Sequence, residues 1–379
     1  MSARMKVGMV GCGVISGIYI RNIARFRDIE LTACADLRPE AAQAVAEQTG
    51  IRALTVDALI ADPEIDIVLN LTVPVAHAAV SAAALAAGKH VYCEKPLGVT
   101  VAEGESLVAA AERNGLRIGV APDTFLGGAH QICRDMIDRD EIGPVVGGTC
   151  FIFSAGMEGW HPNPAFFFQH GGGPVLDVGP YYIAALVNLL GPVTGVAALD
   201  AIGSPERVVG AEGPHKGERI KVEVPTTAMC LLEIAGGARI FLGASWDIPA
   251  HGHRPMELYG RKASLRPPDP NFMGGIIEVG RDRDQWTEID PADRPFGAPN
   301  WPLDAPRLAN DRGLGLADMA AAIRENRPHR ADGRLGLHVL QVADAIIRSA
   351  AERRFIAIDS AADRPAALHA DEARALLRA

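Results

Sequence analysis

Short apolar runs alternate with alanine-rich stretches over residues 6–120, and no other feature constrains the fold as strongly. The apolar runs are KVGMVG, ELTACAD, IDIVLNL, HVYCE and LRIGV. The stretches between them predict helices over 14–26, 39–49, 75–87 and 101–114. Strands that alternate with helices pair in parallel, because each crossover helix returns the chain to the same end of the sheet. We therefore expect an α/β fold with a doubly wound parallel sheet and helices on both faces.

The pattern changes after about residue 121. A helical stretch near 127–140 is followed by the longer strand-like segments VVGGTCFIF, VTGVAALDAIG, TTAMCLLEI, ARIFLGASW and PMELYG. Their alternation and their Gly/Pro turns predict a mostly antiparallel sheet, which two helical segments near the end of the chain could cover. We expect one domain over 1–123 and a second, α+β domain over 124–379. The Pro-, Asp- and Gly-rich segment 265–305 is expected to wrap the surface.

The composition argues against two classes of partner. Lysine and arginine total 37 against 46 acidic residues, which leaves a net charge of −9. A chain this acidic has no general electrostatic attraction to nucleic acid or to an anionic membrane. No uncharged apolar run reaches the roughly 18 residues of a membrane helix, and no secretory segment is recognisable, so we expect a cytoplasmic protein.

Neither disulfides nor a metal site are expected. The six cysteines are scattered without a CxxC pair, which predicts reduced, mostly buried thiols. His251 and His253 are close enough in sequence to share a metal ion, but no third ligand is evident. His338 lies inside an apolar helical pattern and is expected to be a core residue. The alternative is a residue that reaches the substrate site.

A glycine-rich turn, VGMVGCGVISG, follows the first predicted strand. In the dinucleotide-binding fingerprint the first glycine, here Gly11, makes the tight turn, and the second, Gly13, lets the backbone approach a pyrophosphate. The third position needs a small residue, which Ser16 supplies. The helix that begins near Val14 and Ile15 directs unpaired N–H groups and its positive dipole end at the phosphates. The alternative is a tight strand–helix turn without a ligand.

The second predicted strand ends in Asp36, which Leu37 and Arg38 follow. A carboxylate here accepts hydrogen bonds from the adenosine ribose and repels a 2′-phosphate, so we expect NAD rather than NADP. Arg38 could instead meet a 2′-phosphate, and Asp36 is alternatively an ordinary strand-end carboxylate. Thr72 and Pro74 follow a further strand at the same ligand-binding edge, where Thr72 is alternatively a turn or cap residue.

Glu94 and Lys95 stand at the carboxyl end of another predicted strand, in HVYCEKPLG. Because HVYC is apolar throughout, the lysine emerges from a buried sheet beside the expected nicotinamide position. This context favours a role in the site over an ordinary solvated lysine. Pro96 restricts the backbone there and is compatible with a cis bond. We predict that Lys95 is a proton-relay or orienting cation.

A third motif, GGGPVLDVGPYY, precedes an apolar helical pattern at residues 171–182. Pro180 suits the start of that helix, so Asp177 and Tyr181 are predicted near each other at its mouth. Alone, Asp177 is a helix cap and either tyrosine a core residue. Three consecutive glycines cost entropy unless the backbone must approach something closely, which favours the functional interpretation. Tyr182 is expected to pack.

The segment GWHPNPAFFFQHGGG is unusually aromatic. Trp160 and His161 could form the floor of a sugar site, because flat apolar ring faces suit the C–H surface of a sugar. Domain packing is an equal alternative for this segment.

Together these motifs resemble the Gfo/Idh/MocA oxidoreductases over nearly the whole chain. The resemblance rests on the GCGVIS turn, Asp36, the Thr72-Val73-Pro74 string with His77, Glu94-Lys95-Pro96 and the GGG…DxGxY stretch. It implies an N-terminal Rossmann domain, a C-terminal domain with an open, mostly antiparallel sheet, NAD(P) as cofactor, and sugars, cyclitols or their derivatives as substrates. It also implies homodimers or homotetramers assembled through the open sheet.

The resemblance implies active-site roles for Lys95 and Asp177. Many relatives have histidine where this chain has Tyr181. The branch with glucose-fructose oxidoreductase and dimeric dihydrodiol dehydrogenase has tyrosine there as the acid/base, and we transfer that role to Tyr181. An adjacent ammonium such as Lys95 favours the phenolate that a base needs. The chain also departs from many relatives around Asp123, so the substrate of a particular member is not transferred.

The predicted site follows from these assignments. Residues expected at the cofactor are Gly11, Gly13, Val14, Ile15, Asp36, Leu37, Arg38, Thr72, Pro74, His77, Glu94 and Lys95, with His77 supporting the cofactor loop. Residues expected at the substrate are Lys95, Trp160, His161, Asp177 and Tyr181. In the predicted mechanism Tyr181 takes the hydroxyl proton, Lys95 orients and polarises the oxygen, and Asp177 holds both the sugar and the lysine.

Three functions are compatible with this pattern. The first is an NAD-dependent dehydrogenase or reductase acting on a sugar, glycoside or polyol. The second is a lyase, epimerase or glycosidase that retains NAD and oxidises its substrate transiently. The third is a nucleotide-sensing protein without activity, which would not need Lys95, Asp177 and Tyr181 together. Net release of NADH separates the first two.

Overall fold

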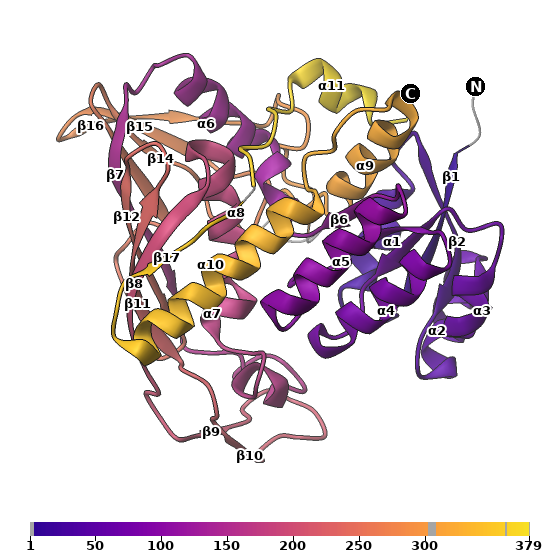
Figure 1. Ribbon diagram of the computed structural model, residues 1–379. Coiled ribbons are helices and arrows are strands. Elements are labelled where there is room, and N and C mark those ends of the chain that lie inside the picture. The colour runs from indigo at the N-terminus through magenta and orange to yellow at the C-terminus, as the bar shows by residue number, and fades with distance from the viewer. Residues whose placement is uncertain (1–3, 302–307, 361, 379) are drawn as a thin grey trace.

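The computed structural model describes residues 4–301, 308–360 and 362–378. Its N-terminal part is a six-stranded parallel sheet with the order β3-β2-β1-β4-β5-β6 and helices on both faces (Figure 1). The strands are β1 Met5–Val10, β2 Ile29–Ala35, β3 Arg52–Leu54, β4 Ile67–Asn70, β5 His90–Cys93 and β6 Ile118–Val120. The helices are α1 Ser16–Ile23, α2 Pro39–Thr49, α3 Val56–Ala61, α4 Pro74–Ala86 and α5 Val101–Arg113. The predicted doubly wound parallel sheet is confirmed.

Local signals explain where these helices begin and end. Pro39 and Pro74 lie in the first turns of α2 and α4, where their missing N–H has no helical partner. Thr100 and Glu103 form a capping box at the start of α5. Gly88 and Gly115, just beyond α4 and α5, have the left-handed backbone that favours glycine there. The short β3 and α3 were not predicted, because three to six residues are too few to show a period.

The second part contains a nine-stranded sheet with the order β16-β15-β14-β13-β7-β12-β11-β8-β17. Within the described residues, β7 and β12 are the only neighbouring strands of this sheet that pair in parallel, and the other pairs are antiparallel. The predicted mostly antiparallel sheet is therefore confirmed. Its strands are β7 Val145–Phe153, β8 Val193–Ala201, β11 Thr227–Ile234, β12 Arg239–Ser245, β13 Met256–Gly260, β14 Ser264–Arg266, β15 Ile277–Asp282, β16 Gln285–Ile289 and β17 Ile356–Ala357. A small separate sheet pairs β9 Glu206–Val208 with β10 Arg219–Lys221.

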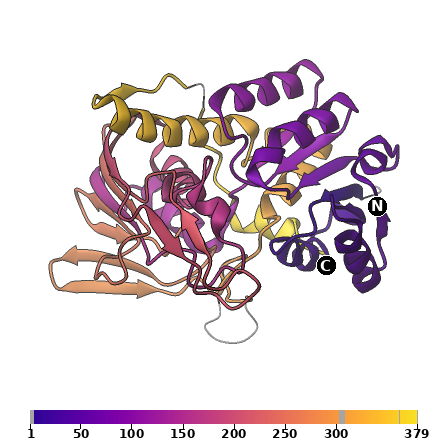
Figure 2. The same cartoon turned by 90° about the horizontal axis from the view of Figure 1, so that it is seen from below.

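The prediction that 265–305 wraps the surface was wrong in part. Within it, β15 and β16 form a hairpin that extends one edge of the large sheet (Figure 2). Charged residues at the tip of this hairpin, Asp282 at the end of β15 and Arg283 and Asp284 in the turn, hide the strand pattern in the sequence. Charged side chains at the edge of a sheet hinder pairing with strands of other chains. The charged composition of this segment is therefore explained by the position of the hairpin at the sheet edge.

In the described part of the chain, the second part also contains six helices, of which α7, α8 and α10 pack on the large sheet. They are α6 Gly128–Asp138, α7 Pro174–Asp177, α8 Gly179–Leu190, α9 Leu314–Glu325, α10 Gly333–Glu352 and α11 Ala370–Ala375, with 3₁₀ turns at Thr124–Leu126 and Ala165–Phe168. The long α10 packs on β8 and also on α5 and β6, so it spans both parts of the molecule (Figure 1). The division of the chain at residue 123 stays a prediction. None of the helices in the described ranges has the length and apolar character needed to cross a membrane.

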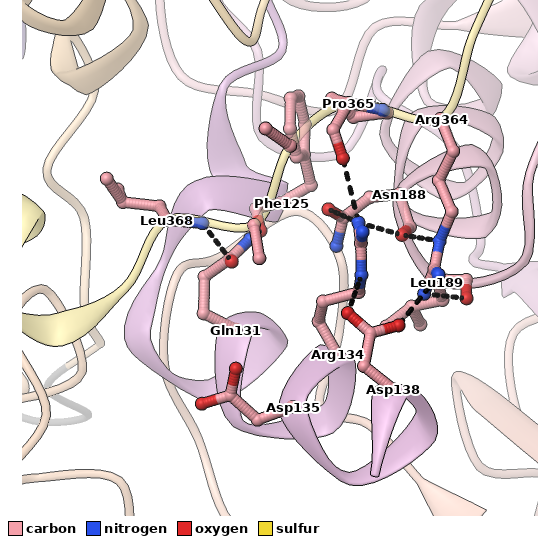
Figure 3. A network of polar contacts seen from close by, with 12 residues as sticks. Phe125, Gln131, Arg134, Asp135, Asp138, Asn188, Leu189, Arg364, Pro365 and Leu368 are labelled. Carbon is pink, nitrogen blue, oxygen red and sulfur yellow. Dashed lines mark hydrogen bonds and ion pairs between the residues drawn. The ribbon is translucent and has the colours of Figure 1, made fainter. Parts of the chain in front are cut away.

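A polar network fixes the C-terminal segment to the second part (Figure 3). The guanidinium of Arg134 on α6 donates to the carbonyl oxygens of Asn188 and Pro365 at 2.8 and 2.9 Å. Asp138 pairs with both Arg134 and Arg364, at 2.6 and 2.7 Å. Further on, the N–H of Arg27 in the N-terminal part donates to the carbonyl of Leu376 at 2.8 Å. The end of the chain therefore ties the two parts of the molecule together.

The histidine inside the apolar helical pattern is a core residue, as expected. His338 is fully buried in α10, and its Nε2 accepts a hydrogen bond from the N–H of Val193 at 3.0 Å. Burial lowers the pKa of His338 to about 4. Between pH 4 and 6.5 the unfolded chain therefore binds a proton that the folded chain does not, so this histidine makes stability fall as the pH falls.

We expect His338→Gln to reduce the acid sensitivity of the fold, because glutamine keeps an acceptor for Val193 but does not titrate. The loss of unfolding free energy between pH 7 and pH 5 should shrink by about 2 kcal/mol. Urea denaturation at the two pH values measures this loss, and the exposed His251→Gln is the control. An unchanged difference between the two pH values would contradict the assignment.

Candidate active site

The glycine-rich turn has the geometry that a dinucleotide needs. Gly11 has a φ of +102°, and a Cβ built on it would lie 2.5 Å from the carbonyl oxygen of Leu71, so only glycine fits. A Cβ on Gly13 would have no atom within 4 Å, which leaves open space above this backbone. The Ser16 hydroxyl donates to the Gly13 carbonyl at 2.7 Å and fixes the turn. Val14 is 88% exposed beside it, and Ile15 is half-buried at the N-terminus of α1.

Asp36 lies next to this turn. One carboxylate oxygen accepts from the N–H of Cys12 at 2.8 Å, and the other accepts from the N–H of Arg38 at 2.9 Å. Each oxygen keeps a further lone pair for a ligand hydroxyl. Leu37 is 94% exposed, and the mostly exposed Arg38 side chain lies 3.9 Å from the same carboxylate. The turn, Asp36 and Leu37 thus meet at the carboxyl edge of the sheet.

The loop after β4 is organised by two buried side chains. Thr72 donates its hydroxyl to the Asn70 side-chain oxygen at 2.7 Å, and Pro74 begins α4. The two ring nitrogens of His77 contact the carbonyl oxygens of Pro96 and Thr72 at 2.6 and 2.9 Å. Burial lowers the pKa of His77, but Cys93 and these two carbonyls outweigh it and raise the pKa to about 9. His77 therefore joins the loop after β4 to the segment that carries Lys95.

Lys95 points out of the sheet toward the second part of the molecule. Its ammonium donates to the carboxylate of Asp177 at 2.7 Å and to the Asp177 carbonyl at 2.6 Å. Burial lowers the pKa of Lys95, but the Asp177 carboxylate, helped by Tyr181 and Glu94, raises it above the usual value. The lysine is therefore a cation and a donor at neutral pH. The Lys95-Pro96 bond is cis.

Glu94 lies beneath the lysine and is buried. Its two carboxylate oxygens accept from the Tyr19 hydroxyl at 2.8 Å and from the Lys95 N–H at 2.9 Å. Both contacts lie within the protein, so the structure places Glu94 in support of the Lys95 backbone.

Tyr181 lies in the first turn of α8, between two cations. The Lys95 ammonium is 5.3 Å from the centre of its ring, and the Arg312 guanidinium carbon is 5.5 Å from it. Of these two, Arg312 contacts the phenol oxygen, with Nη2 at 3.4 Å. The structure thus brings Lys95, Asp177 and Tyr181 together as predicted, and it places Lys95 over the phenol ring. Tyr182 instead donates toward Asp269, at 3.2 Å, and packs.

Arg312 and its neighbours were missed in the sequence. Arg312 follows the irregular segment that was expected on the surface, and no motif marks it. Asp123 is fully buried and accepts from the N–H groups of Gly313 and Gly315 at 2.9 Å each. Burial raises the pKa of Asp123 to about 6. The departure from relatives around Asp123 was the only signal available.

The aromatic segment divides into an exposed part and a part in the core. Trp160 is 65% exposed and its ring lies 5.4 Å from that of His161. Burial lowers the pKa of His161, while the charge of Asp177 acts on it in the opposite direction. The assignment of Trp160 and His161 to the substrate stays a prediction. Phe167 and Phe168 instead pack against Trp246, with ring centres 5.9 and 5.5 Å apart.

His251 and His253 both pack against aromatic rings. The His253 ring stacks on Phe151 with centres 4.0 Å apart, and the His251 ring meets Phe153 edge-on. Across the described ranges, no three His, Cys, Asp or Glu side chains are grouped so as to hold a metal ion. All six cysteines are unpaired, and all but Cys12 are buried.

Two domain families match the sequence in succession. Residues 5–121 match the family described as "Oxidoreductase family, NAD-binding Rossmann fold", and residues 130–266 match the "GFO/IDH/MocA C-terminal domain". The chain belongs to the Gfo/Idh/MocA family. The predicted family is therefore confirmed, while its tyrosine-type branch stays a prediction.

Several relatives in the Gfo/Idh/MocA family have names. The 1,5-anhydro-D-fructose reductase of Ensifer adhaerens is 28% identical over 55% of this chain and 63% of that enzyme. The levoglucosan dehydrogenase of Pseudarthrobacter phenanthrenivorans is 27% identical over 85% of this chain and 88% of that enzyme. Matches to the Salmonella inositol 2-dehydrogenases span only 35% of those enzymes, so this chain covers under two thirds of several relatives.

A solved structure has the same fold. Levoglucosan dehydrogenase in complex with NADH and L-sorbose superposes with a TM-score of 0.78 over 95% of this chain and 100% of that chain, at 23% identity. At this identity the likeness shows the fold alone.

For this Gfo/Idh/MocA member, we expect Asp36→Ala to weaken the preference for NAD over NADP. Hydrogen bonds to a charged acceptor are worth about 1.5–3 kcal/mol, so the ratio of kcat/KM values for the two cofactors should fall by roughly 10- to 100-fold. Steady-state kinetics with each cofactor measures the ratio. Glu47→Ala, an exposed carboxylate on α2, is the control. A ratio unchanged in Asp36→Ala would refute the assignment of Asp36 to the ribose.

Proposed function

We propose that this protein is an NAD-dependent oxidoreductase that transfers a hydride between the nicotinamide and a hydroxyl carbon of a sugar, glycoside or polyol. One observation carries the proposal: the Lys95–Asp177 pair and the Tyr181 phenol meet beside the carboxyl edge of an NAD-binding sheet. A cation fixed by a carboxylate, next to a phenol, is suited to orient an alcohol oxygen and to exchange its proton.

The residues of this chain fit the proposed cofactor. The open space above Gly13 and the N-terminus of α1 suit a pyrophosphate, because unpaired N–H groups point there. Asp36 has free lone pairs for the ribose hydroxyls. Exposed apolar side chains at the same edge suit the faces of an adenine ring, and they are Val14, Leu37, Val73 and Val75. Since Asp36 would repel a 2′-phosphate, NADP is the less favoured cofactor.

The proposed mechanism assigns one task to each side chain. Lys95 donates a hydrogen bond to the substrate oxygen, and Asp177 keeps the ammonium in place while it accepts from a neighbouring sugar hydroxyl. Tyr181 takes the hydroxyl proton during oxidation and returns it during reduction. When bound, the nicotinamide supplies the hydride acceptor or donor. Trp160 and His161 are proposed to contact the sugar from the loop that follows β7.

The relatives support the substrate class. Those named above are a reductase of 1,5-anhydro-D-fructose and dehydrogenases of inositol and levoglucosan. We propose a carbohydrate or cyclitol as the substrate of this chain, and a cytoplasmic location, where six unpaired cysteines would stay reduced.

A panel of sugars, inositols and glycosides tests the proposal, with the absorbance of NADH as the readout. Net formation of NADH with at least one member supports it. Conversion of a glycoside without net NADH would point instead to the class that retains NAD and oxidises the substrate transiently. No reaction with any member, together with tight NAD binding, would favour the nucleotide-sensing alternative.

We further propose that two or four copies associate through the uncovered face of the large sheet. Leu199 on β8 and Leu231 on β11 point away from the covering helices and are 69% and 58% exposed. Neighbouring exposed leucines on a sheet are costly in water and favour burial against a second copy. Light scattering after gel filtration tests this, since a monomeric mass at micromolar concentration would refute it.

A further inference from the structure

We propose that Arg312 is a positioning residue for Tyr181: its guanidinium holds the phenol oxygen and stabilises the negative charge that this oxygen carries when Tyr181 acts as a base. The proposal rests on the proposed function, because it explains how Tyr181 would exchange a proton there.

The first argument is the set of contacts that Arg312 makes. Its Nη2 lies 3.4 Å from the Tyr181 hydroxyl and donates to the carbonyl and side-chain oxygens of Asn271 at 3.0 and 2.8 Å. Its Nη1 donates to the side-chain oxygen of Asn310 at 2.8 Å. These acceptors hold the guanidinium in place. Because both N–H groups of Nη2 already have an acceptor in Asn271, the contact with Tyr181 shares one of them and acts mainly through the charge of the guanidinium. Contacts with substrate-free active sites are often long and shorten in the complex, so 3.4 Å is compatible with the role.

The second argument is the charge of Arg312. The residue is only 7% exposed, and within residues 4–301, 308–360 and 362–378 it forms no ion pair with a carboxylate. A buried cation that donates only to neutral acceptors needs negative charge nearby, and the carboxylates of Glu94 and Asp269 supply part of it without contacting the guanidinium. The phenol oxygen of Tyr181 lies in contact and can become negative by losing its proton. Lys95 is less suited to this task, because Asp177 already neutralises it.

The third argument is the attachment of Arg312 to the cofactor-binding part. Asn22, on the helix that follows the glycine-rich turn, donates to the carbonyl oxygens of Asn310 and Arg312 at 3.0 Å each. Asp123, at the end of the parallel sheet, holds the N–H groups of the two glycines that flank Leu314. The segment that carries Arg312 is thus fixed to the Rossmann domain. The guanidinium position is therefore set relative to the same helix that would bind the cofactor.

Several charged groups face Tyr181 and Arg312, and each belongs to the electrostatic account. Lys95 from the loop after β5 and Arg312 lie on the phenol ring, and Asp177 from α7 acts through Lys95. Charged or titratable groups that act on Arg312 or lie beside its segment are Glu94, Tyr19 on α1, Asp123 and Asp269. The charge of Asp177 also acts on His161. Of these groups, Arg312 is the cation in contact with the phenol oxygen, so its removal should change the protonation of Tyr181 most directly.

The test compares Arg312→Gln, Arg312→Lys, Tyr181→Phe and the double variant Arg312→Gln/Tyr181→Phe. We expect Arg312→Gln to lower kcat/KM by about 10- to 100-fold, without change in the dissociation constant of NAD. The acidic limb of its pH profile should move to higher pH by about one unit. Arg312→Lys should keep the acidic limb near its wild-type pH, because the charge remains. Its kcat/KM should still be lower than that of the wild type. In the Tyr181→Phe background, removal of Arg312 should have no further effect on the rate.

A second readout works without a substrate and keeps this inference separate from the proposed function. The protein is titrated with base while the absorbance of tyrosinate is followed. The part of this absorbance that is missing in Tyr181→Phe belongs to Tyr181, and in Arg312→Gln it should appear at higher pH. If it shifts although no sugar is turned over, the pairing of Arg312 with Tyr181 stands and the proposed activity fails.

Arg330→Gln is the matched structural control, because Arg330 is 6% exposed and bonded to Asp318 away from Tyr181. It should lower thermal stability without moving the pH profile. If Arg312→Gln leaves the acidic limb and the tyrosinate signal unmoved, or lowers the rate equally in the Tyr181→Phe background, the proposal is wrong. If Arg312→Gln does not fold, Arg312→Lys tests the proposal in its place. Because lysine keeps the positive charge, a displacement of the acidic limb of the pH profile by a full unit in Arg312→Lys would overturn the proposal.

Discussion

Lys95→Ala will lower kcat on the order of 10³-fold while the affinity for NAD stays within a few-fold of wild type, because loss of a preorganised donor at the reacting oxygen costs about 10²–10³-fold. The lysine ammonium is held by two oxygens of Asp177 and lies over the Tyr181 ring, beside the position that we propose for the substrate oxygen. The pyrophosphate-binding turn is a separate part of the structure, so NAD binding should survive. Single-turnover kinetics and fluorescence titration with NADH measure the two quantities.

Two further variants separate chemistry from loss of a buried charge. Lys89 is also buried, with its ammonium bonded to the carbonyls of Asp62 and Ile65, so Lys89→Ala removes a comparable cation far from Tyr181. It should lower stability and leave kcat nearly unchanged. Thermal melting of Lys95→Ala and of Lys95→Met combined with Asp177→Asn shows whether an unpaired Asp177 carboxylate destabilises the fold, because the double variant removes both charges of the pair. The rate of the double variant is not diagnostic, since Asp177 also belongs to the proposed site. More than a tenth of the wild-type kcat in Lys95→Ala would contradict the role of Lys95.

Gly13→Ala will weaken NAD binding without lowering the stability of the protein, whereas Gly11→Ala will destabilise the fold. A Cβ on Gly13 meets no protein atom within 4 Å and would occupy the space proposed for the pyrophosphate. Crowding of this kind costs about 1–3 kcal/mol, or roughly 10- to 100-fold in the dissociation constant. A Cβ on Gly11 lies 2.5 Å from a backbone oxygen and adds a strained positive φ, which together cost about 3 kcal/mol or more of stability.

Isothermal titration with NADH and thermal melting of the two variants check this pair of expectations. Gly17→Ala, on the exposed side of α1 with no atom within 4 Å, should bind NADH normally. Gly13→Ala with wild-type affinity would show that the cofactor does not approach this turn.

Local signals made the N-terminal half predictable. A tight turn, a strand-end carboxylate and capping residues all act within a few residues, so Gly11, Asp36 and the ends of α4 and α5 could be read from the sequence. Lys95 and Asp177 are 82 residues apart, and their contact was predicted only because both belong to motifs of a recognised family.

The rest depends on tertiary contacts that leave no local pattern. Arg312 reaches Tyr181 across 131 residues and is held by Asn22, which is 290 residues away. Neither residue belongs to a motif, so the second cation at the phenol could not be foreseen. The β15–β16 hairpin was hidden for the opposite reason, because the charges that protect an edge strand imitate a surface loop.

A crystal structure with NAD bound tests the central claim most directly. Our account predicts the pyrophosphate over Gly13 at the N-terminus of α1, the adenosine ribose on Asp36, and the nicotinamide ring facing Lys95 and Tyr181 with room for one alcohol carbon between the ring and the phenol oxygen. A nicotinamide bound away from these two side chains, or a nucleotide bound elsewhere on the chain, would contradict it.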